Sequence, residues 1–483
     1  MICQLEINGL KTFGQAARAP LAPITLVFGA NSAGKSSLLQ ALLLLKQSLE
    51  ESPDGSVQAG GTQVDLGSYS NLVYAHDVTQ PVSLGVSVTD ADLVHSFAIR
   101  YAGAGIEGQE IVFSWGSEER PVQLRLKRRM DRGRTGEPTW TADEWPAQGL
   151  VEWMSDLLGP RLRVPRGWMS ARQAAERAAG LDRSLEERDG FGSGEVAEAV
   201  RGVGDTFDAK PAGRGENAKR WLPAILRAAP RDDVTRAVRS AIEFVIERIT
   251  NVVLQAVEGV SYLGPSRDAP PRLVIPSGSG GPGLGPTGHL MATRLAHDRA
   301  LLSTVNNHLG DLGLNYTLDI TAVADDDPLL REAYTLRLLD QRFGDPPLPI
   351  NIADVGYGVS QLLPVIVAGV LQPGSTVVVE QPELHVHPGL QARYGQVLVE
   401  QSEHTNFLIE THSEHLMLRL LRNVRSGRLT ADRISVLYIG SSSGSRPGVI
   451  TPLEVDDDGE FLDWWPDGFF TEREDELFDL MDE

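Results

Sequence analysis

The sequence predicts an α/β protein: a mixed sheet with covering helices, joined to an antiparallel β subdomain and interrupted by a helical insertion. Three observations favour this fold class. A short β-branched run over 24–28 leads directly into a glycine-rich turn and then an apolar helix. Strand-like and helix-like segments alternate between 362 and 421, which is typical of a parallel sheet with covering helices. Apolar and polar residues alternate over 82–126, which indicates antiparallel strands.

Length and charge narrow the class of protein. The chain has 483 residues, enough for about three domain-sized units. It carries 44 basic and 65 acidic residues, a net charge of −21, and residues 454–483 alone hold 14 acidic residues and one basic residue. Such an acidic chain argues against sequence-independent wrapping of DNA, because phosphate binding needs clustered Lys and Arg.

Apolar runs in the sequence are short, and cysteine is nearly absent. No run reaches the roughly 20 residues that a membrane helix needs. The single cysteine, Cys3, excludes an internal disulfide. The first residues also lack the features of an export signal. We therefore expect a cytoplasmic protein without a membrane segment.

Changes in pattern divide the chain into four expected parts. Residues 1–149 form an N-terminal lobe with the glycine-rich turn and the antiparallel strands. Residues 150–259, rich in Ala, Arg and Glu, form the helical insertion. Residues 260–453 form a C-terminal lobe in which strands and helices alternate, and residues 454–483 form an acidic tail with aromatic residues.

The turn after the first buried strand has the spacing of a phosphate-binding loop. Gly29 is followed after four residues by Gly34, Lys35 and Ser36. Glycines let backbone N–H groups surround a polyphosphate, and the following helix directs its positive end at the anion. Lys35 would reach the β and γ phosphates, and the Ser36 hydroxyl would hold Mg²⁺. The expected nucleotide contacts of this loop are Asn31, Gly34, Lys35, Ser36 and Ser37.

A second cluster follows the strand predicted at 376–379. Glu380 stands at the strand end, where a carboxylate next to a phosphate loop binds Mg²⁺ directly or through water. Gln381 follows at the position that commonly orients or deprotonates the attacking water. Glutamine orients water but cannot take its proton. Glu383 lies two residues further on.

Two weaker clusters complete the pattern. Gly356 and Gly358, with Ser360, precede an apolar helix and offer N–H donors for an anion. His412 follows another predicted strand end, where an imidazole could contact a γ phosphate. Neither cluster is specific alone, and their order along the chain is what makes them informative.

This order resembles that of ATP-binding-cassette ATPases, and more narrowly their RecF, SMC and OLD-like branch. The matching motifs are FGANSAGKSSLLQALLLL, DVGYGVSQLLPVI, VVVEQPELHVHP and IETHSEHL. The glutamate-glutamine-proline-glutamate run with paired histidines is similar to the bacterial subset linked to phage defence, including the Septu type. The tail GEFLDWWPDGFFTERE and the segment LGPSRDAPPR also look like that subset. The resemblance covers roughly 1–80 and 260–440.

The resemblance implies an ATP-binding-cassette head, ATP and Mg²⁺ as ligands, and a homodimer or higher homo-oligomer. Each ATP would lie between the phosphate loop of one copy and the 356–361 turn of another. It implies that Lys35 and Ser36 contact phosphate and magnesium, Glu380 is the acidic strand-end residue and His412 senses the γ phosphate. Two positions depart from the family. Gln381 replaces the usual catalytic glutamate, and Gly356 replaces a usual serine, so hydrolysis is expected to be slow or to use Glu383 as base.

Three functions remain open from the sequence. The first is an ATPase that dimerises on ATP and regulates a separate effector, plausibly a nuclease, in phage defence. The second is a RecF-like DNA-repair ATPase that binds DNA through the six basic residues of 125–134. The third, the nucleotide-binding subunit of a transporter, is disfavoured because the long insertion does not suit it.

Three further features have a plain structural interpretation beside a functional one. The basic stretch 125–134 is a solvated strand end or a DNA groove. Asp456, Asp457 and Asp458 form an acidic turn or a metal-binding carboxylate cluster of a nuclease. The aromatic residues Trp464, Trp465, Phe469 and Phe470 pack on the chain itself or dock a partner. In each case the structural interpretation is favoured.

Overall fold

The computed structural model describes residues 1–483 except 53, 91–92, 104–107, 118–119, 131–137, 143–146, 159–172, 174, 176–190, 192, 210–221, 228–229, 231, 276–282, 324–332, 443–445 and 467–483. Contacts divide the chain into two units. The first unit comprises Met1–Arg18 and Leu44–Glu258, and the second comprises Ala19–Leu43 and Gly259–Glu483. Helix α1 (Lys35–Glu51) contributes residues to both. Among the described helices, none is long and apolar enough to cross a membrane.

A nine-stranded sheet forms most of the first unit, in the order β10-β9-β8-β7-β6-β5-β4-β1-β2. Strand β1 pairs antiparallel with β4, and every neighbouring pair from β4 to β10 is also antiparallel. Alternate residues of β5 are buried, as the period-2 pattern predicts. The strands are β1 (Ile2–Asn8), β2 (Ala17–Pro20), β4 (Val82–Asp90), β5 (Leu93–Tyr101), β6 (Glu110–Ser117), β7 (Arg120–Met130), β8 (Pro138–Ala142), β9 (Thr206–Ala209) and β10 (Pro223–Leu226).

Helices of the first unit are α2 (Tyr69–Leu72), α3 (Ala147–Leu158), α5 (Ser193–Gly202) and α6 (Asp233–Glu258). Helix α6 buries apolar residues three and four apart, which is the stripe of an amphipathic helix against a core. The part predicted as a helical insertion, 150–259, also contains β9 and β10, which extend the antiparallel sheet. Strands of four residues are too short to give a periodic signal in the sequence.

A six-stranded sheet forms the centre of the second unit, in the order β11-β15-β16-β3-β17-β18. The first five strands are parallel, and β18 pairs antiparallel with β17. The mixed sheet and the antiparallel sheet confirm the predicted α/β fold class. The strands are β3 (Ile24–Gly29), β11 (Val260–Leu263), β15 (Thr376–Glu380), β16 (Asn406–Glu410), β17 (Ile434–Ser442) and β18 (Arg446–Leu453).

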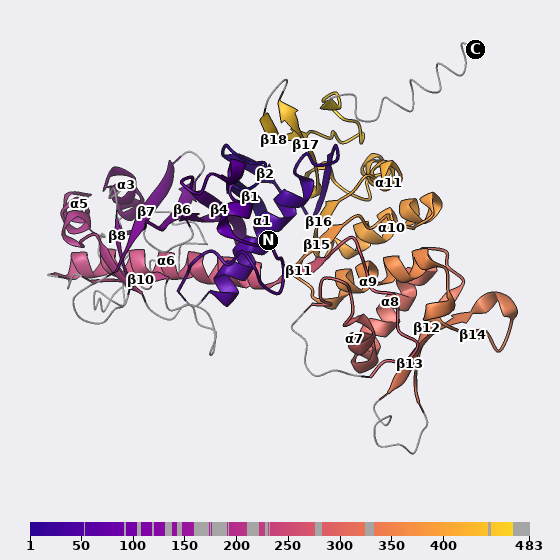
Figure 1. The fold of residues 1–483 in the computed structure, drawn as a ribbon. Coiled ribbons are helices and arrows are strands. Elements are labelled where there is room, and N and C mark those ends of the chain that lie inside the picture. The colour runs from indigo at the N-terminus through magenta and orange to yellow at the C-terminus, as the bar shows by residue number, and fades with distance from the viewer. Residues whose placement is uncertain are drawn as a thin grey trace, which may run out of the picture. The chain divides into compact units, whose positions relative to one another are not determined.

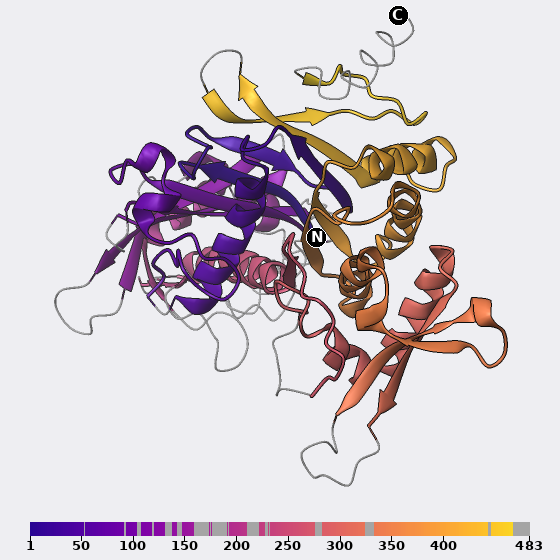
Figure 2. The ribbon, with the colours of Figure 1, turned by 45° about the vertical axis from the view of Figure 1, so that its right-hand side comes forward.

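Helices cover this sheet. Helices α9 (Tyr357–Leu371), α10 (Pro388–Gln401) and α11 (Glu414–Arg425) lie side by side next to β15 and β16 (Figures 1 and 2). All residues of β3 and β15 are buried, as expected for central parallel strands. Helices α7 (Met291–His297) and α8 (Arg299–Asp311) accompany a small antiparallel sheet of β12 (Tyr316–Ala322), β13 (Tyr334–Asp340) and β14 (Leu348–Asn351).

The described part of the acidic tail packs on the second unit. The Trp465 ring meets the rings of Phe28, Phe461 and Tyr438 edge to face, with centroids 5.4, 5.1 and 6.4 Å apart. Asp456 begins a turn in which Gly459 has a φ of +69° and donates to the Asp456 carbonyl. The run 456–458 is therefore an acidic turn. Phe469 and Phe470 lie outside the described residues.

Replacing Trp465 with Ala is expected to destabilise the second unit by about 2 kcal/mol, because the substitution removes a large aromatic side chain from three ring contacts. Urea unfolding of the full chain measures the effect. The adjacent Trp464 is 95% exposed, so Trp464→Ala provides a matched control that should leave the unfolding midpoint unchanged. Equal effects of the two substitutions would contradict the packing described for Trp465.

Candidate functional site

The phosphate-loop sequence forms the turn between β3 and α1 in the second unit. Gly29 ends β3 with a φ of +146°, and a Cβ there would lie 2.1 Å from the Ile439 carbonyl oxygen, so only glycine fits. Gly34 also has positive φ, at +117°, immediately before the first residue of α1. Asn31 is exposed and Ser37 is buried. The turn thus directs the N-terminal N–H groups of a 17-residue helix, which attract anions, toward the loop.

Lys35 is folded back over this loop. Its Nζ donates to the carbonyl oxygens of Gly29 and Ala30, both at 2.9 Å, and the residue is only 5% exposed. Burial lowers the pKa of Lys35, whereas the nearby carboxylates Glu410 and Glu383 act to raise it. The loop therefore holds a desolvated ammonium group among backbone groups, where a phosphate oxygen would be a stronger partner than a carbonyl.

Ser36 contacts a carboxylate that the sequence analysis did not single out. Its Oγ donates to Oε2 of Glu410 at 2.8 Å. Glu410 ends β16, which lies between β15 and β3 and pairs with both. Burial raises the pKa of the Glu410 carboxyl, with a smaller contribution in the same direction from Glu383. The available signal was that Glu410 directly follows a strand predicted at 406–409, as Glu380 follows the strand predicted at 376–379, but the order of the strands was needed to use it.

Glu380 lies directly beside Glu410 in the sheet, since the two residues are register partners. Its Oε1 accepts a hydrogen bond of 2.8 Å from the Tyr262 hydroxyl. Two carboxylates at neighbouring strand ends and the Ser36 hydroxyl form an all-oxygen donor set, the kind that Mg²⁺ prefers. The residues present thus fit a magnesium ion. The sequence predicts Glu380 as the carboxylate of this site, whereas the carboxylate that is hydrogen-bonded to Ser36 is that of Glu410.

Gln381 occupies a constrained turn after β15. Its φ is +45°, uncommon for a residue with a side chain, and its N–H donates to the Glu410 carbonyl at 2.7 Å. Arg267 donates to the Gln381 carbonyl at 3.3 Å. Hydrogen bonds from its backbone N–H and to its carbonyl therefore fix the position of this residue. Its side-chain amide is suited to orienting water.

The carboxylate of Glu383 is hydrogen-bonded to the segment that holds His412. The two Glu383 carboxylate oxygens accept hydrogen bonds from the backbone N–H of His412 at 2.7 Å and from the Thr411 hydroxyl at 2.8 Å. Each oxygen accepts one hydrogen bond, so the carboxylate is held beside the backbone of 411–412. Burial, and next the charge of Lys35, lower the pKa of His412, so its imidazole is neutral at pH 7.

The predicted glycine turn before α9 lies against the turn that follows β15. Gly356 caps the helix and is exposed, and a Cβ added there would meet no atom within 4 Å. A Cβ on Gly358 would lie 2.6 Å from the His385 carbonyl oxygen, which explains that glycine. In the described part of the chain, no hydrogen bond joins 356–360 to 29–36.

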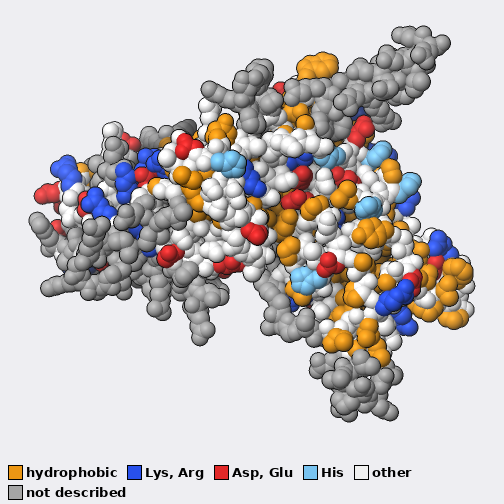
Figure 3. All heavy atoms as spheres, in the orientation of Figure 1, with side chains coloured by type: hydrophobic (Ala, Val, Ile, Leu, Met, Phe, Trp, Pro, Cys, Tyr) orange, Lys and Arg blue, Asp and Glu red, His pale blue; other side chains and the backbone are white. Residues whose placement is uncertain are grey.

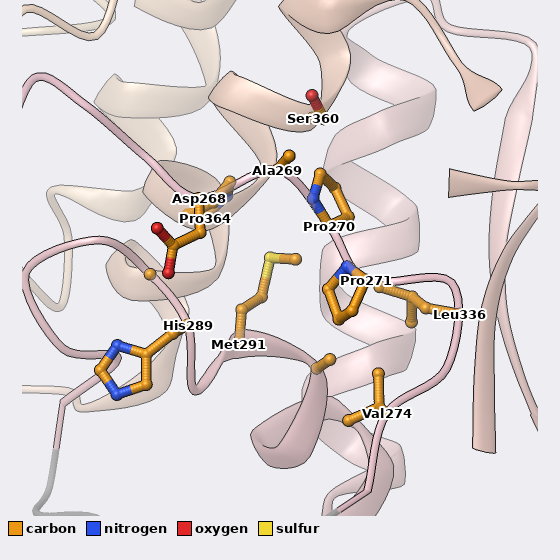
Figure 4. Close-up of a pocket in the computed structure, with 12 residues that line it drawn as sticks. Asp268, Ala269, Pro270, Pro271, Val274, His289, Met291, Leu336, Ser360 and Pro364 are labelled. Atoms are coloured by element: carbon orange, nitrogen blue, oxygen red, sulfur yellow. The ribbon is translucent and has the colours of Figure 1, made fainter. Parts of the chain in front are cut away.

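Ser360, a predicted nucleotide contact, is buried at the start of α9. It is 3% exposed, and its hydroxyl donates to the Tyr357 carbonyl at 2.8 Å within its own helix. It faces a small pocket with Pro364 and the segment 268–274 (Figure 4). The exposed donors of this turn are therefore its backbone N–H groups rather than the serine hydroxyl.

The basic stretch of β7 is not a continuous charged surface. Arg128 is 6% exposed, donates to the Gln109 side chain and lies over the Trp140 ring, so it packs inside the first unit. Arg125 and Arg129 are exposed, and Lys127 pairs with Glu110. On the face drawn in Figure 3, the described Lys and Arg side chains are interspersed with Asp and Glu. Arg132 and Arg134 lie outside the described residues.

Comparison with known proteins gives one family match. Residues 303–418, about a quarter of the chain, match the family described as "AAA domain, putative AbiEii toxin, Type IV TA system". The matched segment runs from α8 into α11 and includes the ends of β15 and β16, whereas the phosphate loop lies outside it. No curated protein matches the sequence.

Solved structures with a similar arrangement include heads of SMC proteins. One is the SMC head domain from Thermotoga maritima, with 11% identity, a TM-score of 0.38, and coverage of 94% of this chain and 99% of that chain. Another is an Smc head with an extended coiled coil from Pyrococcus furiosus, bound to the C-terminal domain of ScpA. It has 12% identity, a TM-score of 0.38, and coverage of 100% and 99%.

Proposed function

We propose that the second unit binds ATP with Mg²⁺ at the 29–36 turn and hydrolyses it slowly. The observation that carries the proposal is the juxtaposition of Lys35, Ser36 and Glu410 around a glycine turn at a helix N-terminus. A buried ammonium group, a hydroxyl and a carboxylate lie together there, at the carboxyl ends of β3 and β16. This set of groups suits a metal-bound polyphosphate and leaves an uncharged ligand without matched partners.

Each group has a distinct part in the proposed reaction. Lys35 leaves its carbonyl partners to bind phosphate oxygens, and the N–H groups at the start of α1 bind others. Ser36, Glu410 and Glu380 would supply oxygen ligands for Mg²⁺, which would neutralise phosphate charge when bound. Gln381 orients the attacking water without removing its proton, and neutral His412 offers a hydrogen bond to the γ phosphate. Because Gln381 cannot take the proton of the attacking water, slow turnover is expected.

A second copy of the chain would complete the site. The exposed turn at Gly356 offers helix N-terminal donors that are not bonded to the phosphate loop of the same chain. We infer that ATP joins two copies, each turn closing over the other copy's triphosphate. The nucleotide state would then control an effector. Within the described residues, the group of His, Asp and Glu close enough to share an ion is His308, Asp311 and Glu400 rather than Asp456–Asp458. The effector that we propose is a nuclease on a separate chain, in phage defence.

Self-association tests this proposal. Sedimentation of the wild-type chain is expected to show a change from one copy to two on addition of Mg²⁺ and a slowly hydrolysed ATP analogue. Gly356→Glu places a carboxylate on the exposed turn without a clash in its own chain, so it should repel the partner's triphosphate and prevent association. Its affinity for ATP as a single copy should remain within about twofold of wild type. Association that is independent of nucleotide, or unchanged in Gly356→Glu, would contradict the proposal.

A further inference from the structure

Arg267 is a buried cation close to the proposed ATP site that has no part in the chemistry described above. It is 3% exposed and follows β11 in the segment 264–274. Its guanidinium donates to the backbone carbonyl of Glu380 at 2.7 Å and to that of Gln381 at 3.3 Å. A guanidinium whose donors hold two successive carbonyls fixes the backbone between them, because the planar group has one preferred orientation.

The backbone of the same residue reaches the start of α9. The Gln361 side chain, 2% exposed, donates from Nε2 to the Arg267 carbonyl at 3.3 Å. Residues 268–271 and Val274 line a small pocket together with Ser360 and Pro364 of α9 (Figure 4). One residue therefore contacts the end of β15 through its side chain and the first turns of α9 through its main chain.

A second contact joins the same two segments. The Tyr357 ring at the start of α9 meets the His385 ring at 4.9 Å, and the backbone of Gly358 lies against the His385 carbonyl. His385 belongs to the turn that begins at Gln381. The start of α9 is thus in contact with both ends of the 381–385 turn, through Arg267 at one end and His385 at the other.

We propose that Arg267 is a positioning residue that ties the start of α9 to the end of β15. This inference rests on the proposed function, in which the α9 turn meets the triphosphate of a second copy and Gln381 orients water. When the α9 turn engages nucleotide, Arg267 holds the Gln381 peptide in its unusual conformation. Arg267 itself touches neither nucleotide nor water in this scheme.

Steady-state ATPase kinetics of Arg267→Gln test the inference. We expect kcat to fall about tenfold, while the affinity of the single copy for a fluorescent ATP analogue stays within about twofold of wild type. Arg267→Lys keeps the charge but not the fork of donors, so its kcat should lie between the two. Arg433 provides a matched control, because its guanidinium also donates to a backbone carbonyl, that of Ser402, in the same unit. Arg433→Gln should leave kcat unchanged.

Several results would overturn the inference. These are a kcat for Arg267→Gln equal to wild type, a fall no larger than that of Arg433→Gln, or a loss of ATP affinity that accounts for the whole loss of activity. If Arg267→Gln does not fold, Gln361→Met removes the donor to the Arg267 carbonyl, and kcat should fall about threefold with ATP affinity unchanged. An unchanged kcat in a folded Gln361→Met would also overturn it.

Failure of the proposed function gives a different result. A wild-type chain that neither binds nor hydrolyses ATP removes the proposed function and this inference together. A wild-type chain that hydrolyses ATP, with Arg267 variants that do so equally well, removes the inference alone.

Discussion

Replacing Lys35 with Ala is expected to abolish measurable ATP binding and to lower ATP turnover by about 100-fold or more, because the substitution removes the ammonium group that lies against the phosphate-loop carbonyls. Isothermal titration with Mg²⁺ and ATP, together with phosphate release, measures both. The fold should persist. Burial lowers the pKa of Lys35, which means that the folded state disfavours its charged form, so the melting temperature should stay the same or rise.

Two variants control for this result. Lys46 is also buried in α1 and donates to the carbonyl of Glu258 at 2.8 Å. Lys46→Ala should reduce thermal stability while ATP affinity is kept, the reverse of the pattern for Lys35→Ala. Lys35→Arg keeps the charge but is larger, so partial binding is expected. Wild-type affinity and turnover in Lys35→Ala would show that the 29–36 turn is not the phosphate site.

Replacing Glu410 with Gln is expected to lower kcat about 100-fold and to raise the Mg²⁺ concentration needed for half-maximal activity about tenfold. The substitution keeps the shape and an oxygen near Ser36 but removes the charge that would face the metal. Titration of ATPase activity with Mg²⁺ measures both quantities. Glu403→Gln, at an exposed carboxylate paired with Arg433, should leave them unchanged.

The affinity of the wild-type chain for Mg²⁺ should fall at acidic pH. Burial raises the pKa of Glu410 above its ordinary value of 4.5, so the ionised form that binds Mg²⁺ is lost at a higher pH than for an exposed glutamate. Mg²⁺ affinity should therefore fall as pH decreases toward that raised pKa, and the fall should be smaller in Glu410→Gln.

The same pKa shift predicts an effect on stability without metal. A carboxyl whose pKa is raised by folding favours the folded state at pH below 4.5, and this contribution is lost as pH rises through the raised pKa. At pH 7 without Mg²⁺, Glu410→Gln should therefore melt at a higher temperature than wild type, and the difference should shrink on acidification. A lower melting temperature at pH 7, together with unchanged Mg²⁺ dependence, would contradict the assignment of Glu410.

Local parts of the site were predictable from the sequence, and non-local parts were not. The phosphate loop is a continuous segment whose spacing identifies it, and its glycines are required by geometry within a few residues. The contact between Ser36 and Glu410 joins residues 374 positions apart and depends on β16 lying between β15 and β3. Strand order in a parallel sheet is set by crossover connections, which leave no local pattern.

The basic stretch 125–134 differs from a DNA-binding groove because Arg128 lies on the buried face of β7. Val122, Leu124, Leu126 and Arg128 alternate along β7 and are all buried, so the period-2 rule would have placed Arg128 on the inner face. The basic residues of 125–129 therefore do not share one face of the strand. Charge reversal at Arg128 would place a carboxylate in the core of the first unit, so that substitution does not test DNA binding.

Mixing two inactive variants tests the shared ATP site most directly. Lys35→Ala lacks the phosphate contact, and Gly356→Glu lacks a usable closing turn, so neither labelled variant should pair with itself when the ATP analogue is added. A mixed pair contains one intact combination of both turns. We predict energy transfer between differently labelled Lys35→Ala and Gly356→Glu chains that depends on the analogue and Mg²⁺. Absence of transfer in the mixture, when wild-type chains do pair, would contradict a site built from two copies.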